Sequence, residues 1–249
     1  MTPYFFFFGS ICCFSFSFLV FFKNKTSPVN KSYFYYSFCL GVWLFFWTLT
    51  FFSNHNTLIL TRIILLPAYF LPVTFNMFSN GFRHHKLLSS YEKWFHTIML
   101  TIFLSTWYSQ LNIKTAELLN GDLHFTFGPV YSLFGIYLLS GMGIGVFNLV
   151  IQLKNSAYKK KLQLKHCILG TIMGTLNGLF FSFVMPAFGF VTLNKFATLS
   201  SLWIVGFSFY AITKHKLMNI NILISKTVSY IITAVIFFVG IIFTMYLKQ

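Results

Sequence analysis

Long apolar segments recur along the chain and are separated by short polar gaps. A helix needs about 20 such residues to cross the hydrocarbon core of a bilayer. None of the segments shows the alternation of an outer-membrane barrel, and backbone hydrogen bonding in lipid otherwise permits only helices. The pattern therefore predicts an all-α, polytopic transmembrane helical bundle of seven spans plus an eighth, C-terminal span: residues 4–22, 33–52, 58–79, 94–110, 128–152, 164–185, 194–213 and 227–247.

The composition supports a membrane location. Of 249 residues, 57% are hydrophobic and only 8% are charged. In a typical soluble domain about a quarter of all residues are charged. The 18 Lys and Arg outnumber 3 Asp and Glu, but they lie in short gaps between apolar runs and not on a solvated face. This placement argues against a nucleic-acid partner and fits the anionic cytoplasmic leaflet of a lipid bilayer.

The basic residues predict the orientation. Fourteen of the eighteen fall in the gaps after the first, third, fifth and seventh spans: Lys23, Lys25, Lys31, Arg83, Lys86, Lys93, Lys154, Lys159, Lys160, Lys161, Lys165, Lys214, Lys216 and Lys226. By the positive-inside bias, these gaps are cytoplasmic and the N-terminus is outside. The first span has no basic segment before it and no small-residue cleavage site after it, so we expect a retained anchor and not a signal peptide.

Four segments are informative through their order and spacing along the chain. They are "FGPVYSLFGIYLL" (127–139), "LQLKHCILGTIMGTLNGLF" (162–180), "PAFG" (186–189) and "YAITKHKLMNINILISKTVSYII" (210–232). Together they resemble the N-terminal seven-helix membrane region of certain bacterial sensor histidine kinases. The resemblance implies a sensory module in the bacterial inner membrane, working with a cytoplasmic kinase or output domain that is separate or missing from this chain. The chain departs from that family at Asn219 and Asn221, where acidic residues are common.

We therefore expect three parts: a seven-helix sensory module at 1–213, a cytoplasmic amphipathic connector at 214–226, and the eighth span at 227–249. In the connector, Lys214, Lys216 and Lys226 would meet anionic lipid while the apolar residues lie at the headgroup boundary. The alternative is an ordinary basic flank of a membrane span.

Small residues repeat every four positions in the sixth span, at Gly170, Gly174, Gly178 and Ser182, and more weakly in the fifth, at Gly141 and Gly145. Such a face lets another backbone approach closely. We expect these two helices to pack against each other, or the sixth helix to pack against a second subunit in a homodimer. Intramolecular packing alone is the alternative.

Polar residues within the spans are the candidates for ligand binding. Pro67 and Pro72 can kink the third span, and together with Tyr69, Thr74 and Asn76 they could line a small cavity. Asn148 and Asn177 are further amides within spans. For all of these, hydrogen bonding between helices is the alternative interpretation.

Catalysis and cofactor binding find no support in the sequence. Glu92 falls in a cytoplasmic gap, and Glu117 and Asp122 fall in the longest outer loop, so the prediction places no carboxylate inside the bundle, which argues against a proton-coupled transporter. The seven His do not form a haem pair or a metal site and are expected at the surface. The four Cys are interpreted as small apolar residues.

A sensory, signal-transducing module without enzymatic activity or cofactor is the functional prediction. The alternative from another class is a small-solute transporter or permease, which should show an internal repeat and a discontinuous helix. A purely structural membrane subunit is the third option.

Overall fold

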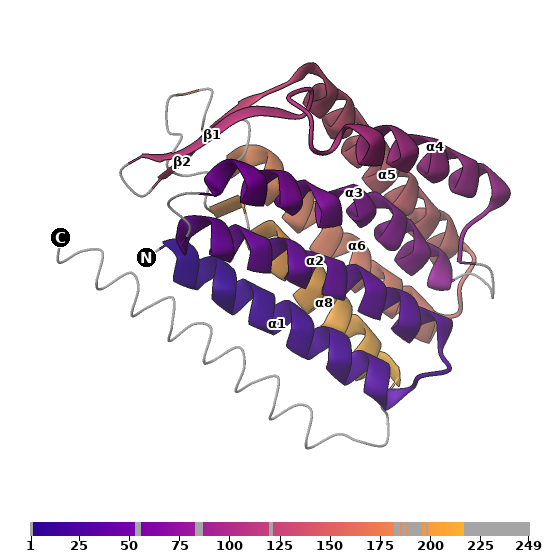
Figure 1. Cartoon of the computed structure of the whole chain (residues 1–249). Coiled ribbons are helices and arrows are strands. Elements are labelled where there is room, and N and C mark those ends of the chain that lie inside the picture. Colours follow the sequence, from indigo (N-terminus) through magenta and orange to yellow (C-terminus); the bar gives the residue numbers. More distant parts are fainter. Residues whose placement is uncertain are drawn as a thin grey trace.

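The computed structural model describes residues 2–52, 56–82, 87–119, 122–181, 185, 188, 196–197 and 199–216. Figure 1 shows the resulting bundle. The helices are α1 (Thr2–Lys23), α2 (Pro28–Phe52), α3 (Thr57–Gly81), α4 (Ser90–Thr106), α5 (Pro129–Lys154), α6 (Tyr158–Leu179) and α8 (Leu199–Lys216), and the strands are β1 (Ile113–Leu119) and β2 (Asp122–Phe127).

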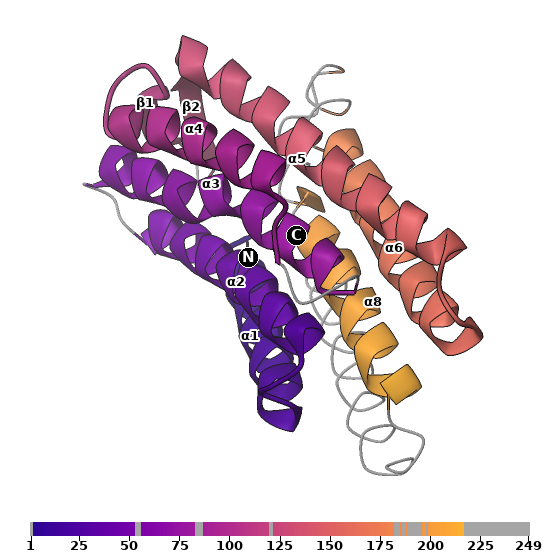
Figure 2. The same cartoon turned by 90° about the vertical axis from the view of Figure 1, so that its right-hand side faces the viewer.

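The described helices run in alternating directions along the bundle (Figure 1). The connections from α1 to α2, from α2 to α3 and from α5 to α6 are short, as in an up-and-down bundle. Helix α3 packs between α2 and α5, with α4 against both α3 and α5. Helix α8 packs on α6 and also contacts α1 and α2, and Figure 2 shows α6 and α8 side by side. The last described helix therefore returns to the first two.

Four helices combine the length and the composition needed to cross a membrane: α1, α2, α3 and α5. The chain is accordingly a mostly helical protein with several candidate membrane spans. The apolar part of α8, Ser200–Thr213, is shorter. The count of seven spans plus an eighth stays a prediction, and residues 217–249, with Lys226 and the eighth span, lie outside the described residues.

The ends of the helices differ from the ends of the predicted spans, for example in α4 and α6. Helix α4 ends at Thr106 and not at 110, which leaves 17 residues, about 26 Å at 1.5 Å per residue. Helix α6 begins at Tyr158 and not at 164, because lysine is a good helix former and the basic segment continues the helix instead of forming a loop.

A β-hairpin replaces the expected outer loop at 110–127. Strands β1 and β2 pair antiparallel from Leu119 opposite Asp122 to Ile113 opposite Phe127, with an irregularity between Ile113 and Thr115. The signal in the sequence is the Asn-Gly pair at 120–121 between segments with β-forming residues, which favours a tight hairpin turn. The purely helical prediction is therefore incomplete here.

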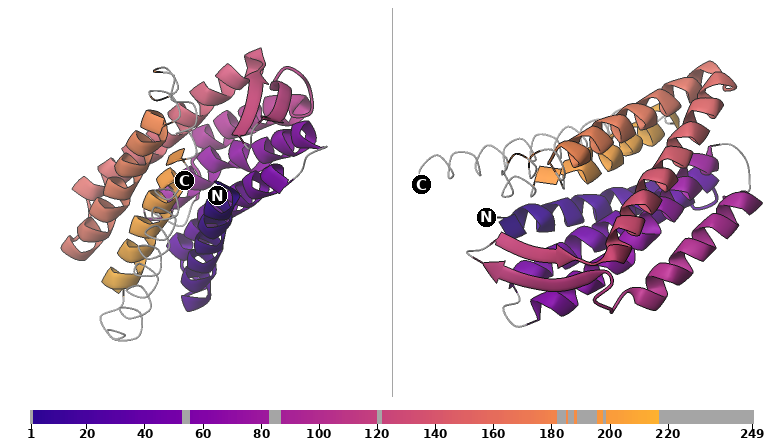
Figure 3. Two further views of the ribbon diagram at one scale, coloured as in Figure 1. Left: turned by 90° about the vertical axis from the view of Figure 1, so that its left-hand side faces the viewer. Right: turned by 90° about the horizontal axis from the view of Figure 1, so that it is seen from above.

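One end of the bundle gathers basic residues. The C-termini of α1, α3, α5 and α8 and the N-termini of α2, α4 and α6 meet at this end, on the right in Figure 1. We call it the basic end; its described bases include Lys23, Lys25, Lys31, Lys93, Lys154, Lys160, Lys161 and Lys165. Figure 3 shows the hairpin at the opposite end of the bundle, which is also the end at which α1 begins. We call that the hairpin end.

The glycine faces of α5 and α6 do not meet each other, contrary to expectation. A Cβ on Gly170 would lie 2.5 Å from Phe207 Cβ of α8, and one on Gly174 would overlap Ile204 of α8. On α5, a Cβ on Gly141 would lie 2.5 Å from Pro72 Cβ of α3. Each face thus packs against another helix within the chain, whereas Ser182 lies outside the described residues.

Candidate functional site: a buried polar network

A carboxylate lies buried where α4 begins. Glu92 is 4% exposed, although the sequence suggested a solvated gap. The Ser89 side chain accepts a hydrogen bond from the Glu92 backbone N–H at 3.3 Å, and the Ser89 N–H donates to Glu92 Oε2 at 2.7 Å. This reciprocal capping box follows from the Ser-x-x-Glu spacing, and it folds the carboxylate back over the start of the helix.

The same carboxylate joins three helices. Asn80 Nδ2 of α3 donates to Glu92 Oε2 at 2.9 Å, and Asn148 Nδ2 of α5 donates to Oε1 at 2.8 Å. Burial alone would raise the pKa of Glu92, but the hydrogen bonds from Ser89, Asn80 and Asn148 outweigh it and leave the pKa below its ordinary value. The prediction that no carboxylate enters the bundle is therefore wrong.

His96 lies one turn further along α4 and is also buried, at 2% exposed. Its Nε2 lies 2.9 Å from Asn76 Nδ2, and its Nδ1 lies 2.9 Å from the Tyr137 hydroxyl. His96 therefore bridges Asn76 of α3 and Tyr137 of α5. It is a buried group inside the bundle and not the surface histidine that was expected.

Backbone contacts extend the network along the seam between α3 and α5. Gln152 Nε2 donates to the Ser79 carbonyl at 2.9 Å, and Ser79 Oγ donates to the Asn76 carbonyl at 3.0 Å. A Cβ on Gly145 would lie 2.8 Å from Asn76 Oδ1. Glycine at this position therefore lets α5 come close enough to α3 for the amides to reach their partners.

We call this set the polar network; its members are Asn76, Ser79, Asn80, Ser89, Glu92, His96, Tyr137, Asn148 and Gln152. Three pairs recur with the same spacing of four, Asn76 with Asn80, Glu92 with His96, and Asn148 with Gln152. Residues four apart share one face of a helix. This repeated spacing on three helices is the signal that could have revealed the network from the sequence.

The predicted ligand residues fall in different places. Asn76 and Asn148 belong to the polar network. Tyr69 is fully buried two turns before Asn76, stacked on Phe103 with 4.9 Å between ring centroids, and Phe103 in turn lies 5.4 Å from the Tyr137 ring. Asn177 lies on α6, outside the network.

Tyr69, Thr74 and Asn76, the residues of the proposed cavity, differ in their surroundings. Tyr69 and Asn76 are 0% exposed and pack against other helices. Thr74 is partly exposed and donates to the carbonyl of Phe70 on its own helix at 2.9 Å. A ligand cavity among these three side chains stays a prediction.

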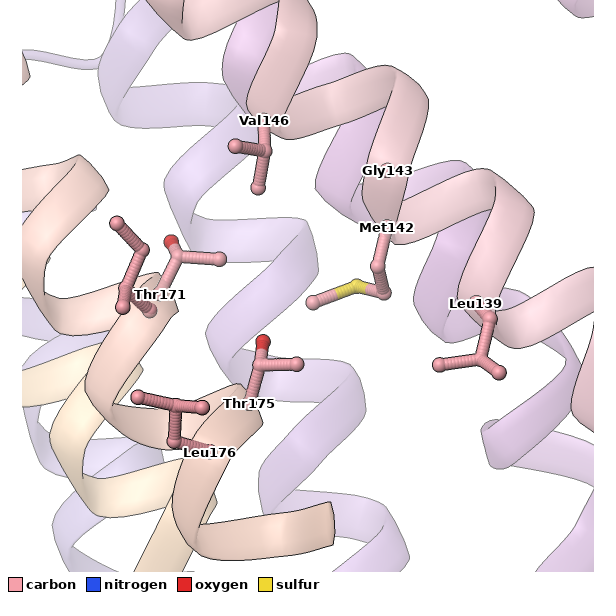
Figure 4. Close-up of a pocket in the computed structure, with 8 residues that line it drawn as sticks. Leu139, Met142, Gly143, Val146, Thr171, Thr175 and Leu176 are labelled. Carbon is pink, nitrogen blue, oxygen red and sulfur yellow. The ribbon is translucent and has the colours of Figure 1, made fainter.

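A groove does open elsewhere, between α5 and α6, as Figure 4 shows. Its volume is about 320 Å³, and its lining is Leu139, Met142, Gly143, Val146, Thr171, Ile172, Thr175 and Leu176. The Thr171 hydroxyl donates to the Cys167 carbonyl at 2.8 Å. The groove is therefore mainly apolar and contains none of the predicted ligand residues.

No family model, curated protein or solved structure matches this chain. Among the described residues, no group of three or more His, Cys, Asp or Glu could hold a metal ion. The geometry of the polar network and of the helices that it joins is therefore the basis on which a function can be proposed.

Proposed function

We propose that the protein is a multi-pass sensory module of a bacterial inner membrane, which transmits a structural change along α3 between the hairpin end and the basic end. One observation carries this proposal: α3 is hydrogen-bonded at both ends. Arg62 near its start donates to the Ile113 carbonyl of β1 at 3.1 Å, and Asn76 and Asn80 near its end belong to the polar network.

The contacts at the basic end favour discrete arrangements of α3 over gradual movement. A small rotation of α3 would separate Asn80 from Glu92 or Asn76 from His96. Each buried polar group left without a partner costs about 1–3 kcal/mol, so intermediate positions are unfavourable. Pro67 and Pro72 lie between the two ends of α3, and each removes one backbone hydrogen bond and so makes bending easier.

Helix α4 offers a second route between the same two ends. It begins with Glu92 and His96 in the polar network, and the segment after it leads directly into β1. A change at the hairpin could thus reach the polar network through both α3 and α4. This supports signal transmission over a purely structural role.

In the proposed orientation the basic end is cytoplasmic and the N-terminus is outside. Helix α8 runs to Lys216 at the basic end, and we propose that the connector, 214–226, lies next to the anionic inner leaflet. A change in the network would then pass to a cytoplasmic kinase or output domain. The module itself has no proposed catalytic step.

A small-solute transporter is the second candidate, and Glu92 is the observation that favours it. Buried carboxylates in membrane bundles often mark ion or proton pathways. Against this, α3, α4 and α5 are each continuous helices, whereas transporter sites are typically built on interrupted helices. The carboxylate of Glu92 is also bound by the Ser89 backbone and by the side chains of Asn80 and Asn148, and these hydrogen bonds hold α3, α4 and α5 together.

The proposal can be tested by changing a residue at the basic end and measuring the effect at the hairpin end, because coupling between two sites acts in both directions. Spin labels are attached at Tyr4→Cys on α1 and Glu117→Cys on β1, both exposed positions at the hairpin end, in the full chain without native Cys. We expect Asn148→Leu, at the basic end, to change the distance distribution between these labels.

Phe147→Leu is the matched control, since Phe147 is the adjacent residue and is 64% exposed. It should leave the distribution unchanged. If Asn148→Leu and Phe147→Leu both give the wild-type distribution, the two ends are not coupled and the sensory proposal fails.

A further inference from the structure

A buried positive charge lies at the hairpin end of α3. Arg62 is 7% exposed. Its Nη2 donates to the Ile113 carbonyl at 3.1 Å, and its guanidinium carbon lies 5.1 Å from the centre of the Tyr108 ring. Its Nε is buried and has no hydrogen-bond partner. Both described contacts are neutral, so neither balances the charge.

The three acidic residues of the chain lie elsewhere. Glu92 is at the basic end, held by Asn80 and Asn148. Glu117 lies four residues along β1 from Ile113, about 13 Å at the usual strand rise. Asp122 pairs with Leu119 at the far end of the hairpin, about 20 Å from Ile113 by the same measure. Arg62 is therefore buried without an acidic partner from the described chain, and such charges are costly unless an anion pairs with them.

Two other buried polar atoms without a partner belong to residues near Ile113, the residue that Arg62 contacts. The Tyr69 hydroxyl is two turns along α3 and packs in one buried cluster with Ile113. The Asn112 side-chain oxygen belongs to the residue just before Ile113. Both atoms are buried without a hydrogen-bond partner. The region beneath the hairpin thus contains several polar atoms that the chain itself leaves unpaired.

The Tyr108 ring lies against the guanidinium of Arg62. The Tyr108 side chain is itself 55% exposed, so it also meets the surroundings. Trp107 and Tyr108 also fit the aromatic residues that gather at the membrane–water interface. Arg62 would then lie at the depth where lipid phosphates are found.

We propose that Arg62 is an anion-binding residue at the hairpin end, which binds a phosphate group when the Tyr108 ring moves aside. Arginine suits phosphate because its planar N–H groups form two parallel hydrogen bonds with phosphate oxygens. The phosphate has two sources, a phospholipid headgroup or free inorganic phosphate. The site is argued from the surroundings of Arg62 alone and does not require that the protein transmits a signal.

The test measures thermal unfolding of the full chain in a phosphate-free maltoside detergent. One arm adds sodium phosphate against sodium chloride of equal ionic strength. The other adds dioleoylphosphatidylglycerol against dioleoylglycerol, which has the same acyl chains and no phosphate. We expect a rise in Tm that saturates with the phosphate-bearing ligand in at least one arm, and the arm that responds identifies the source.

Arg62→Gln should weaken the apparent Kd by at least about tenfold, because a neutral amide cannot replace charge-assisted hydrogen bonds. Lys114→Gln is the matched control, because it removes the same charge from an exposed position on β1, and it should keep the wild-type Kd. Equal weakening by both variants, or an unchanged Kd for Arg62→Gln, would overturn the proposal.

Tyr108→Ala keeps the test decisive if Arg62→Gln does not fold. It retains the charge and removes the ring that must move, so binding should tighten by about two- to fivefold, the equivalent of one exposed cation–π contact. An unchanged or weaker Kd for Tyr108→Ala, or no Tm response of the wild type in either arm, would show that Arg62 does not bind phosphate in this way.

Discussion

The contact between α6 and α8 allows a prediction from two glycines one turn apart. A Cβ on Gly174 would overlap Ile204 and lie 2.6 Å from the Ser200 carbonyl oxygen, whereas a Cβ on Gly178 would meet Ser200 Cβ at 3.5 Å. Contacts below 3.0 Å force atoms to move, and a backbone carbonyl in a packed helix moves less easily than a side chain. We therefore expect Gly174→Ala to destabilise the bundle and Gly178→Ala to be tolerated.

The magnitude follows from two opposing terms. Replacing glycine by alanine inside a helix contributes about 0.5–1 kcal/mol in favour of folding at either position. Only Gly174→Ala adds the overpacking term, about 1–3 kcal/mol. Because the helix-forming term is common to both variants, the difference between their unfolding free energies isolates the close contact and should itself be about 1–3 kcal/mol.

The measurement is reversible unfolding in mixed micelles of a mild detergent and sodium dodecyl sulfate, followed by circular dichroism. Gly143→Ala is a further control, because a Cβ there has nothing within 4 Å, and it should behave like Gly178→Ala. Unfolding free energies that agree within about 0.5 kcal/mol for Gly174→Ala and Gly178→Ala, less than the smallest expected overpacking term, would refute the close packing of α6 on α8.

Two further predictions concern Glu92 and the topology. Glu92→Gln should cost about 1–3 kcal/mol in the same unfolding assay, because its amide N–H would face one of the donors that now bind the carboxylate. The lowered pKa of Glu92 means that its stabilisation is present above the ordinary carboxyl pKa and is lost as pH falls through the folded-state value. Wild-type stability should therefore fall below about pH 4.3, and Glu92→Gln should lack this component; identical pH profiles would contradict it. In a background without native Cys, Leu118→Cys should react with an impermeant maleimide in intact cells and Tyr158→Cys should not, and the reverse pattern would invert the orientation.

The tertiary contacts decided which partners the polar residues have. The sequence places Asn76 and Asn148 within predicted spans, but it does not show that both side chains reach residues of one turn of α4. The polar and basic residues around Glu92 predict a cytoplasmic gap and not a buried position. Only the capping box, together with the approach of α3 and α5, turns that carboxylate into the bundle.

The hairpin is a second feature that depends on contacts between distant residues. Its two strands are short, and an isolated two-stranded hairpin is only marginally stable. The packing of Ile113 and Ala116 into the cluster with Tyr69, and the bond from Arg62, add contacts that local propensity does not describe. Local sequence alone therefore predicts an outer loop here, and the contacts with α3 stabilise the hairpin.

The sequence by itself determined that the chain is a helical membrane protein, because apolar length and backbone hydrogen bonding in lipid allow little else. It also determined that bases gather in alternate gaps, which antiparallel helices then bring to one end. It showed that α5 and α6 each carry a glycine face, since a spacing of four is a local property of a helix. Tertiary structure alone decided that these faces meet α3 and α8, and that Glu92, His96 and Arg62 are buried, because such contacts join residues far apart in the sequence.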